Sequence, residues 1–212
     1  SFRYPGAQDD ALSHISFRVG KGQTLAIIGA TGSGKSTLIG LIPRFYDVTG
    51  GQVLVDGRDV REFTFDALYD RLGYVTQRAT LFSGTVQSNV FFGSGSAPET
   101  EETLQKALDL SQAAEFVNSY PEGAQHRIAQ LGRNVSGGQK QRLAIARALA
   151  RGAEILVFDD SFSALDYRTD AKLRAGLAAQ MAGVTKIIVA QRISTIRHAD
   201  EILVLERGEL VG

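Results

Sequence analysis

The chain has 212 residues, 43% of them hydrophobic and 22% charged, so an ordinary folded globule with ample core is expected. The chain has 23 basic residues (Lys and Arg) and 23 acidic residues (Asp and Glu). It therefore lacks the excess of positive charge that is typical of nucleic-acid-binding proteins, and no nucleic-acid partner is expected. Cysteine is absent, which excludes disulfides and thiolate metal sites, and no apolar run approaches the ~18 residues of a membrane helix.

The first predicted element is a half-buried strand, because Ile15, Phe17 and Val19 alternate with polar residues. Upstream of it, Tyr4 is either a packing residue at a strand end or a flat surface for an aromatic base. From the residues alone packing is favoured, because aromatic side chains are core material first.

A short apolar strand, Thr24–Ile28, leads into a glycine-rich turn and then into a helix that continues through Leu38–Ile42. The turn has the pattern G-x-x-x-x-G-K-S, which is that of a phosphate-binding loop. Its glycines let backbone N–H groups point inward at a phosphate chain, and the helix N-terminus adds positive charge there. The residues predicted to bind a nucleoside triphosphate are Gly29, Ala30, Thr31, Gly32, Ser33, Gly34, Lys35, Ser36 and Thr37.

Within this loop Lys35 is expected to reach the terminal phosphates, and the Ser36 hydroxyl is expected to hold Mg²⁺. The alternative is a chance glycine-rich turn. It would require strand, loop and helix to fall in the required order by coincidence.

Further along, Gly50–Gly57 predicts a strand closed by an Asp-Gly turn, and Phe65–Leu72 predicts a short helix. The stretch Leu72–Gln77 predicts a strand that ends at Gln77. An isolated glutamine is usually a solvated loop residue, but ligands collect at the C-terminal ends of strands in such α/β folds.

Residues 78–150 change in character, because polar–apolar helices are predicted at Glu99–Leu110 and Ala113–Ser119 with Gly- and Ser-bearing links. We interpret this region as a helical subdomain inserted into an α/β core. Its last helix opens with Ser136, Gly137, Gly138 and Gln139 and continues to Leu149. Ser136 is a plausible N-cap and the glycines leave the helix mouth open to phosphate, although a plain capped helix also fits the pattern.

The stretch Glu154–Asp160 predicts a central parallel strand that ends in two carboxylates. At that strand end Asp159 would place an anion beside Mg²⁺ bound at Ser36. The remaining predicted elements are a helix that starts at Ser163–Asp166, a buried strand Lys186–Ala190 that ends at Gln191, and a strand Glu201–Leu205 followed by a turn at Arg207–Glu209.

The whole chain resembles the nucleotide-binding domain of the ATP-binding cassette (ABC) family. The resemblance rests on the order of its motifs, which are the phosphate loop, the glutamine, the S-G-G-Q helix, the acidic strand and the final polar residue. The stretch Thr80–Val86 with Asn89-Val90 is similar to the exporter branch. The resemblance implies an α/β P-loop NTPase fold with a RecA-like parallel sheet, an N-terminal antiparallel β subdomain and an inserted helical subdomain. One domain would span residues 1–212, with the core and β subdomain in 1–77 and 151–212 and the helical subdomain in 78–150. Family members normally extend beyond both ends, so we expect the chain to be cut from a longer protein.

The resemblance also implies roles for particular residues. Tyr4 would stack on the adenine of ATP, which reverses the preference for packing, and Gln77 would join Ser36 and Asp159 around Mg²⁺ and sense the membrane part. Two such domains would pair head to tail, so that Ser136–Gln139 of one closes over ATP on the phosphate loop of the other. The domain would then be an ATPase that drives transport through transmembrane helices of its own longer chain, at the cytoplasmic face of the membrane.

Two positions depart from the family pattern, because Asp160 stands where the family has Glu and Gln191 stands where it has His. The Asp carboxylate is set back by about 1.5 Å, and a displacement of ~1 Å can cost roughly 10²-fold in rate. Gln191 can donate a hydrogen bond but cannot carry a proton. With Gln77 and Lys35 these are the candidate catalytic residues, and we expect ATP binding to survive while hydrolysis is slow.

The preferred interpretation is the degenerate-site subunit of a heterodimeric exporter, whose different partner chain brings Glu and His at these places. The alternative is that Asp160 and Gln191 are tolerated drift in a working enzyme. Two other functions remain open: a soluble ABC-type ATPase acting on DNA or ribosomes, and a regulatory ATP-binding module that never hydrolyses ATP. Neutral net charge and the exporter-like stretch Leu81–Val90 weigh against the first of these.

Overall fold

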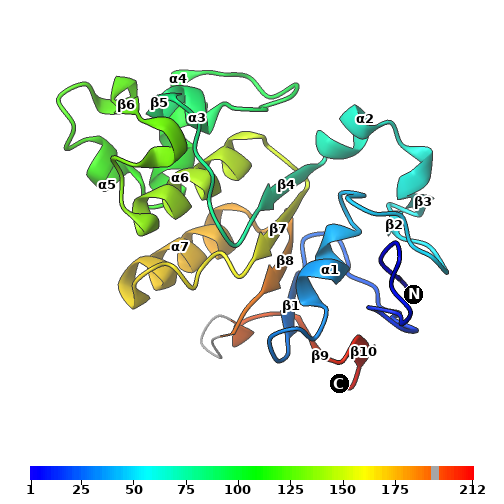
Figure 1. Cartoon of the computed structure of the whole chain (residues 1–212). Coiled ribbons are helices and arrows are strands. Elements are labelled where there is room, and N and C mark those ends of the chain that lie inside the picture. The colour runs from blue at the N-terminus through cyan, green and yellow to red at the C-terminus, as the bar shows by residue number, and fades with distance from the viewer. Residues whose placement is uncertain (192–195) are drawn as a thin grey trace.

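A six-stranded sheet forms the centre of the protein (Figure 1), whose computed structural model describes residues 1–191 and 196–212. The strand order is β10-β9-β1-β8-β7-β4, and all neighbours pair in parallel except β9 and β10. The strands are β1 Thr24–Ile28, β4 Leu72–Val75, β7 Ile155–Asp159, β8 Thr185–Val189, β9 Glu201–Glu206 and β10 Glu209–Leu210. The predicted P-loop α/β fold is confirmed, with a mixed sheet.

The central strands are apolar because both of their faces are covered. In β7 successive side chains alternate between two cores, so that Leu156 and Phe158 face one side of the sheet and Val157 faces the other. All five residues of β8 are buried. Covering both faces of a parallel sheet requires such nearly continuous apolar runs, which is why these strands could be predicted.

One face of the sheet is covered by helix α1 and by the N-terminal third of the chain. Leu38 and Ile39 of α1 pack in the same core as Phe2 and Leu12, which form an isolated antiparallel bridge. A short hairpin with the predicted Asp-Gly turn lies on this side. The elements are α1 Lys35–Gly40, β2 Leu54–Val55, β3 Arg58–Asp59, the 3-10 turn η1 Val60–Glu62 and α2 Phe65–Tyr69. Within residues 1–77, the antiparallel pairs are the β2–β3 hairpin and the bridge between Phe2 and Leu12.

The other face is covered by helices of residues 78–150 and by α7, which lie together in Figure 1. The predicted helical character of this region is borne out by its elements, which also include an unpredicted two-stranded ladder, β5–β6. They are β5 Gly84–Thr85, α3 Val86–Val90, α4 Glu101–Leu110, α5 Ala114–Val117, η2 Gly123–Gln125, β6 Arg127–Ile128, η3 Gln130–Gly132 and α6 Gly137–Ala150, followed by α7 Tyr167–Gln180. The subdomain boundaries at 77 and 150 stay predictions.

Some predicted elements differ from the structure: the helix expected through Ile42 ends at Gly40, and the strand expected at residues 50–57 is confined to Leu54–Val55. The alternation at Ile15, Phe17 and Val19 does not form a strand: the stretch has no ladder partner among the described residues, and Phe17 is exposed while its two neighbours in the pattern are half-buried. The helix predicted from Phe65 to Leu72 ends at Tyr69, because Leu72 begins strand β4. Its two aromatic residues, Phe65 and Tyr69, are exposed, so only part of the predicted apolar face is buried.

Candidate functional site

The phosphate-loop sequence joins the end of β1 to the start of α1, as its pattern predicts. Gly29, Gly32 and Gly34 have φ angles of 150°, 81° and 101°, a region that residues with side chains rarely adopt. A Cβ atom on Gly29 would lie 2.1 Å from the carbonyl oxygen of Leu205 in β9. Glycine is therefore required here both by backbone conformation and by the close approach of a neighbouring strand.

The Lys35 side chain folds over the loop. Its Nζ donates hydrogen bonds to the carbonyl oxygens of Gly29 and Ala30 at 2.8 and 2.7 Å, and lies 3.3 Å from the Ser33 hydroxyl. Burial lowers the pKa of the Lys35 ammonium, and the nearby Asp160 and Asp159 carboxylates oppose this shift. The loop thus carries a buried cation at its centre, where a phosphate chain would be attracted.

Ser36 and Asp159 meet although they are far apart in sequence. The Ser36 hydroxyl donates to Oδ1 of Asp159 at 2.9 Å, because α1 begins beside the C-terminal end of β7. Burial raises the pKa of Asp159, and the Ser36 hydrogen bond opposes the shift. A hydroxyl and a carboxylate are hard oxygen ligands, and a Mg²⁺ ion that also binds phosphates needs few others from the protein. The residues present therefore fit a Mg²⁺ ion.

Asp160 is held by two glutamine side chains. Its Oδ2 atom accepts a hydrogen bond from Gln191 Nε2 at 2.9 Å and another from Gln77 Nε2 at 3.3 Å. The backbone of Asp160 has φ 45°, and the residue is buried, whereas Gln191 is exposed. The structure thus brings together three residues that the sequence analysis placed at the ends of different strands. In this arrangement the Gln77 amide contacts Asp160.

Two polar residues that support this site were missed by the sequence analysis. Gln141 of α6 donates from Nε2 to the carbonyl oxygen of Thr76 at 3.2 Å, and the Ser161 hydroxyl donates to that of Val75 at 2.9 Å. Both side chains are buried, and both fix the segment that delivers Gln77. Gln141 could have been found from the sequence, because it is a polar residue on the apolar face of a predicted helix.

Tyr4 lies against the phosphate-loop helix. Its hydroxyl is 2.9 Å from the Thr37 hydroxyl, and its ring contacts the buried Phe2 at 4.8 Å between centroids. The side chain remains 36% exposed. Tyr4 therefore packs against Phe2 at one edge and leaves part of its ring exposed near the loop, and its stacking on adenine stays a prediction.

The start of α6 has the predicted N-cap. The Ser136 hydroxyl accepts a hydrogen bond from the backbone N–H of Gln139 at 3.2 Å, and Gln139 Oε1 accepts one from the N–H of Ser136 at 2.8 Å, which makes a capping box. Ser136 and Gly137 are exposed, and a Cβ on Gly137 would meet open space. Across the described residues, no hydrogen bond joins Ser136–Gln139 to the chain's own phosphate loop.

Within residues 1–191 and 196–212, none of the helices combines the length and apolar character that crossing a membrane requires. No group of three or more His, Cys, Asp or Glu side chains suited to a metal ion was found in the same described part of the chain.

Comparisons with known proteins agree with this geometry. A sequence profile described as "ABC transporter" matches residues 12–163. An ABC transporter ATP-binding protein of Mycobacterium tuberculosis is 51% identical over 215 residues, and an ATP-dependent lipid A-core flippase of Albidiferax ferrireducens is 45% identical over 211. Each match covers 100% of this chain and 36% of the relative. The solved structure of a bacterial Atm1-family ABC exporter with ATP bound superposes with a TM-score of 0.93 at 37% identity, again over 100% of this chain and 36% of that one.

Proposed function

Because the chain belongs to the ABC transporter family, we propose that it is the motor domain of a membrane exporter whose own site hydrolyses ATP slowly. ATP-binding domains of this family are ATPases, and ATP hydrolysis is the activity of this domain. The exporter assignment is supported by relatives that include a lipid A-core flippase and an Atm1-family exporter. The chain spans 36% of the length of each, so the remainder of the protein would hold the transmembrane helices.

In this proposal ATP binds along the phosphate loop. The loop N–H groups and Lys35 would contact the β- and γ-phosphates, and Tyr4 would stack on the adenine. Ser36 and Asp159 would hold Mg²⁺ with Gln77 nearby, and the ion would supply charge neutralisation for the transferred phosphoryl group. The hydrogen bond between Ser36 and Asp159 supports this, because it already brings two oxygen ligands together.

The slow-site part of the proposal rests on one observation, the contact of Asp160 with Gln191 and Gln77. A general base must reach the proton of the attacking water, and the carboxylate of Asp is one methylene shorter than that of Glu. Here its Oδ2 is also engaged by two amides, which compete with a water for the same oxygen. Gln191 donates a hydrogen bond but, unlike His, cannot take up a proton.

A complete transport cycle would need a second nucleotide-binding domain. The exposed helix mouth at Ser136–Gln139 would close over ATP bound to that partner, while the partner closes over Lys35 and its loop. We propose a different partner chain with Glu and His at the positions of Asp160 and Gln191, at the cytoplasmic face of the membrane. The intact Ser136–Gln139 capping box supports a working contribution to the partner's site.

Measuring ATP binding and ATP turnover separately tests the proposal. MgATP should bind, whereas steady-state turnover should fall below the ordinary enzyme range of roughly 1–10³ s⁻¹. Turnover within that range at the Asp160 site would contradict the slow-site assignment. A single-turnover experiment with the partner present separates slow hydrolysis from a module that never hydrolyses ATP.

A further inference from the structure

Tyr46 belongs to a cluster of three aromatic rings that includes the candidate base-stacking residue. The ring of Tyr46 lies 5.2 Å from that of Tyr4 with an interplanar angle of 85°, and 5.4 Å from that of Phe2. Phe2 in turn meets Tyr4 at 4.8 Å and 81°. Each of the three rings therefore contacts the other two.

The crosswise geometry leaves Tyr4 without a parallel-stacked partner among the described residues. Both neighbouring rings meet it at angles near 90°, an arrangement favoured by the charge distribution of aromatic rings. The Tyr4 hydroxyl is fixed by Thr37 at the far end of the ring. Without such contacts, a half-exposed tyrosine side chain would lose rotational freedom when a base binds. Contacts that fix the ring beforehand reduce this entropic cost and so favour binding.

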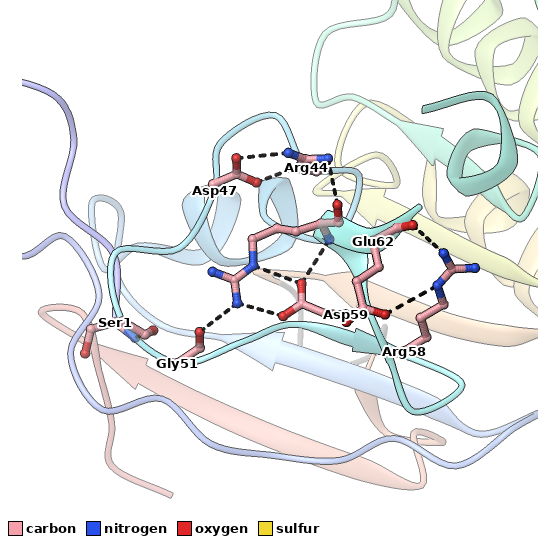
Figure 2. A network of polar contacts seen from close by, with 9 residues as sticks. Ser1, Arg44, Asp47, Gly51, Arg58, Asp59 and Glu62 are labelled. Atoms are coloured by element: carbon pink, nitrogen blue, oxygen red, sulfur yellow. Dashed lines mark hydrogen bonds and ion pairs between the residues drawn. The ribbon is translucent and has the colours of Figure 1, made fainter. Parts of the chain in front are cut away.

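The turn that carries Tyr46 is itself held by charge pairs, which Figure 2 shows. Arg44 donates from Nε and Nη2 to the two carboxylate oxygens of Asp47 at 2.7 and 3.2 Å, and this bidentate pair spans Tyr46. Arg44 also lies 3.5 Å from the carbonyl oxygen of Arg61, whose guanidinium is paired with Asp59. The turn is thereby connected to the β2–β3 hairpin region.

The hydrogen bond from Arg44 holds the pKa of Asp47 below its usual range, so the pair is charged at neutral pH. Phe2, the other ring of the cluster, is only 2% exposed and is fixed through backbone hydrogen bonds with Leu12. Tyr46, in contrast, is 45% exposed. Its position on the surface is therefore set mainly by the turn and by its aromatic contacts.

We propose that Tyr46 is a positioning residue for the nucleobase, which acts by holding the Tyr4 ring in the orientation that stacks on a purine. This inference rests on the proposed function, because it requires the chain to bind ATP. The inference places Tyr46, which lies outside the phosphate loop, among the residues that contribute to binding of the base and not to binding of the phosphates. Tyr46 should therefore affect affinity only for ligands that carry a base.

Binding of MgATP and of magnesium tripolyphosphate to the 212-residue chain, measured by titration calorimetry, tests this role. Tyr46→Leu should weaken ATP binding by roughly 2- to 10-fold, the range expected from loss of one aromatic pair, and leave tripolyphosphate affinity unchanged. Tyr46→Phe keeps the ring and should bind both ligands like the parent. The matched control is Tyr69→Leu, a second exposed tyrosine that contacts Phe65 on helix α2.

A second variant, Asp47→Asn, weakens the pair that holds the turn and leaves all three rings in place. It should give a smaller loss of the same kind, selective for ATP, and circular dichroism should report an unchanged fold. Equal loss of ATP and tripolyphosphate affinity, or parental ATP affinity in both variants, would overturn the inference. If the parent bound tripolyphosphate and ATP equally weakly, the proposed ATP function itself would fail, and the inference with it.

Discussion

Replacing Asp160 by Glu together with Gln191 by His should accelerate ATP hydrolysis by about 10- to 10²-fold. In the structure the Asp160 carboxylate accepts hydrogen bonds at 2.9 Å from Gln191 and at 3.3 Å from Gln77. Glu adds one C–C bond and carries the carboxylate forward by about 1.5 Å, comparable with the ~1 Å misplacement that costs roughly 10²-fold in rate. A 10²-fold gain corresponds to about 2.7 kcal/mol of activation free energy.

The two substitutions should not act additively, because they share one hydrogen bond. Asp160→Glu alone must displace the Gln191 amide, and Gln191→His alone leaves the carboxylate short, so each single variant should gain less than the pair. Phosphate release at saturating MgATP measures the rates, and ATP affinity is measured in parallel. Asp160→Asn serves as the control and should abolish the residual turnover. A double variant that hydrolyses ATP at the parental rate with intact ATP affinity would refute the reasoning.

Three further predictions concern binding and stability. Lys35→Ala removes the cation from the phosphate loop and should weaken MgATP binding at least about tenfold in calorimetry; parental affinity would contradict its role. Asp170→Ala breaks the pair of a fully buried carboxylate with Arg174, at 2.8 Å within α7. It should lower the free energy of unfolding in urea by about 2–3 kcal/mol, less than for two fully buried charges because Arg174 is partly exposed. Arg61 lowers the pKa of Asp59 from 3.8 to about 2, so the stability difference between the parent and Asp59→Asn should be fully present above pH 3.8 and be lost as pH falls through about 2. Thermal unfolding across this range measures it, and a constant difference would count against the pair.

The phosphate loop and the capped helix α6 could be predicted because their determinants are local. Each is specified by a few consecutive residues. The loop requires glycines that adopt positive φ, and the helix requires a side chain that caps its own N-terminus, and both requirements are visible within one turn of sequence. The buried strands β7 and β8 could be predicted for a similar reason, since covering both faces of a sheet leaves a continuous apolar run in the sequence.

The contacts of the site depend on strand order, which local patterns do not contain. Gln77 and Asp160 are 83 positions apart, and Gln191 is 31 positions from Asp160, so their meeting at one oxygen atom follows only from the pairing of β4, β7 and β8. The strand predicted at Ile15–Val19 failed because alternation indicates a half-buried strand only where a partner strand is available. The ring of Tyr46 likewise gave no signal, since its neighbours come from distant positions in the chain.

Strands β4 and β7 lie side by side, although residues 76–154 separate them in the sequence. That long segment therefore leaves the sheet and rejoins it at adjacent places, where Arg71 contacts Glu154 at 2.6 Å. The sheet already fixes the distance between the two ends of this segment. The entropic cost of closing the segment would therefore increase only with the logarithm of its length if residues were added. An exposed turn position such as that between Gly95 and Ser96 should therefore accept added sequence, even a fused reporter domain, without a change in the pairing of β4 with β7.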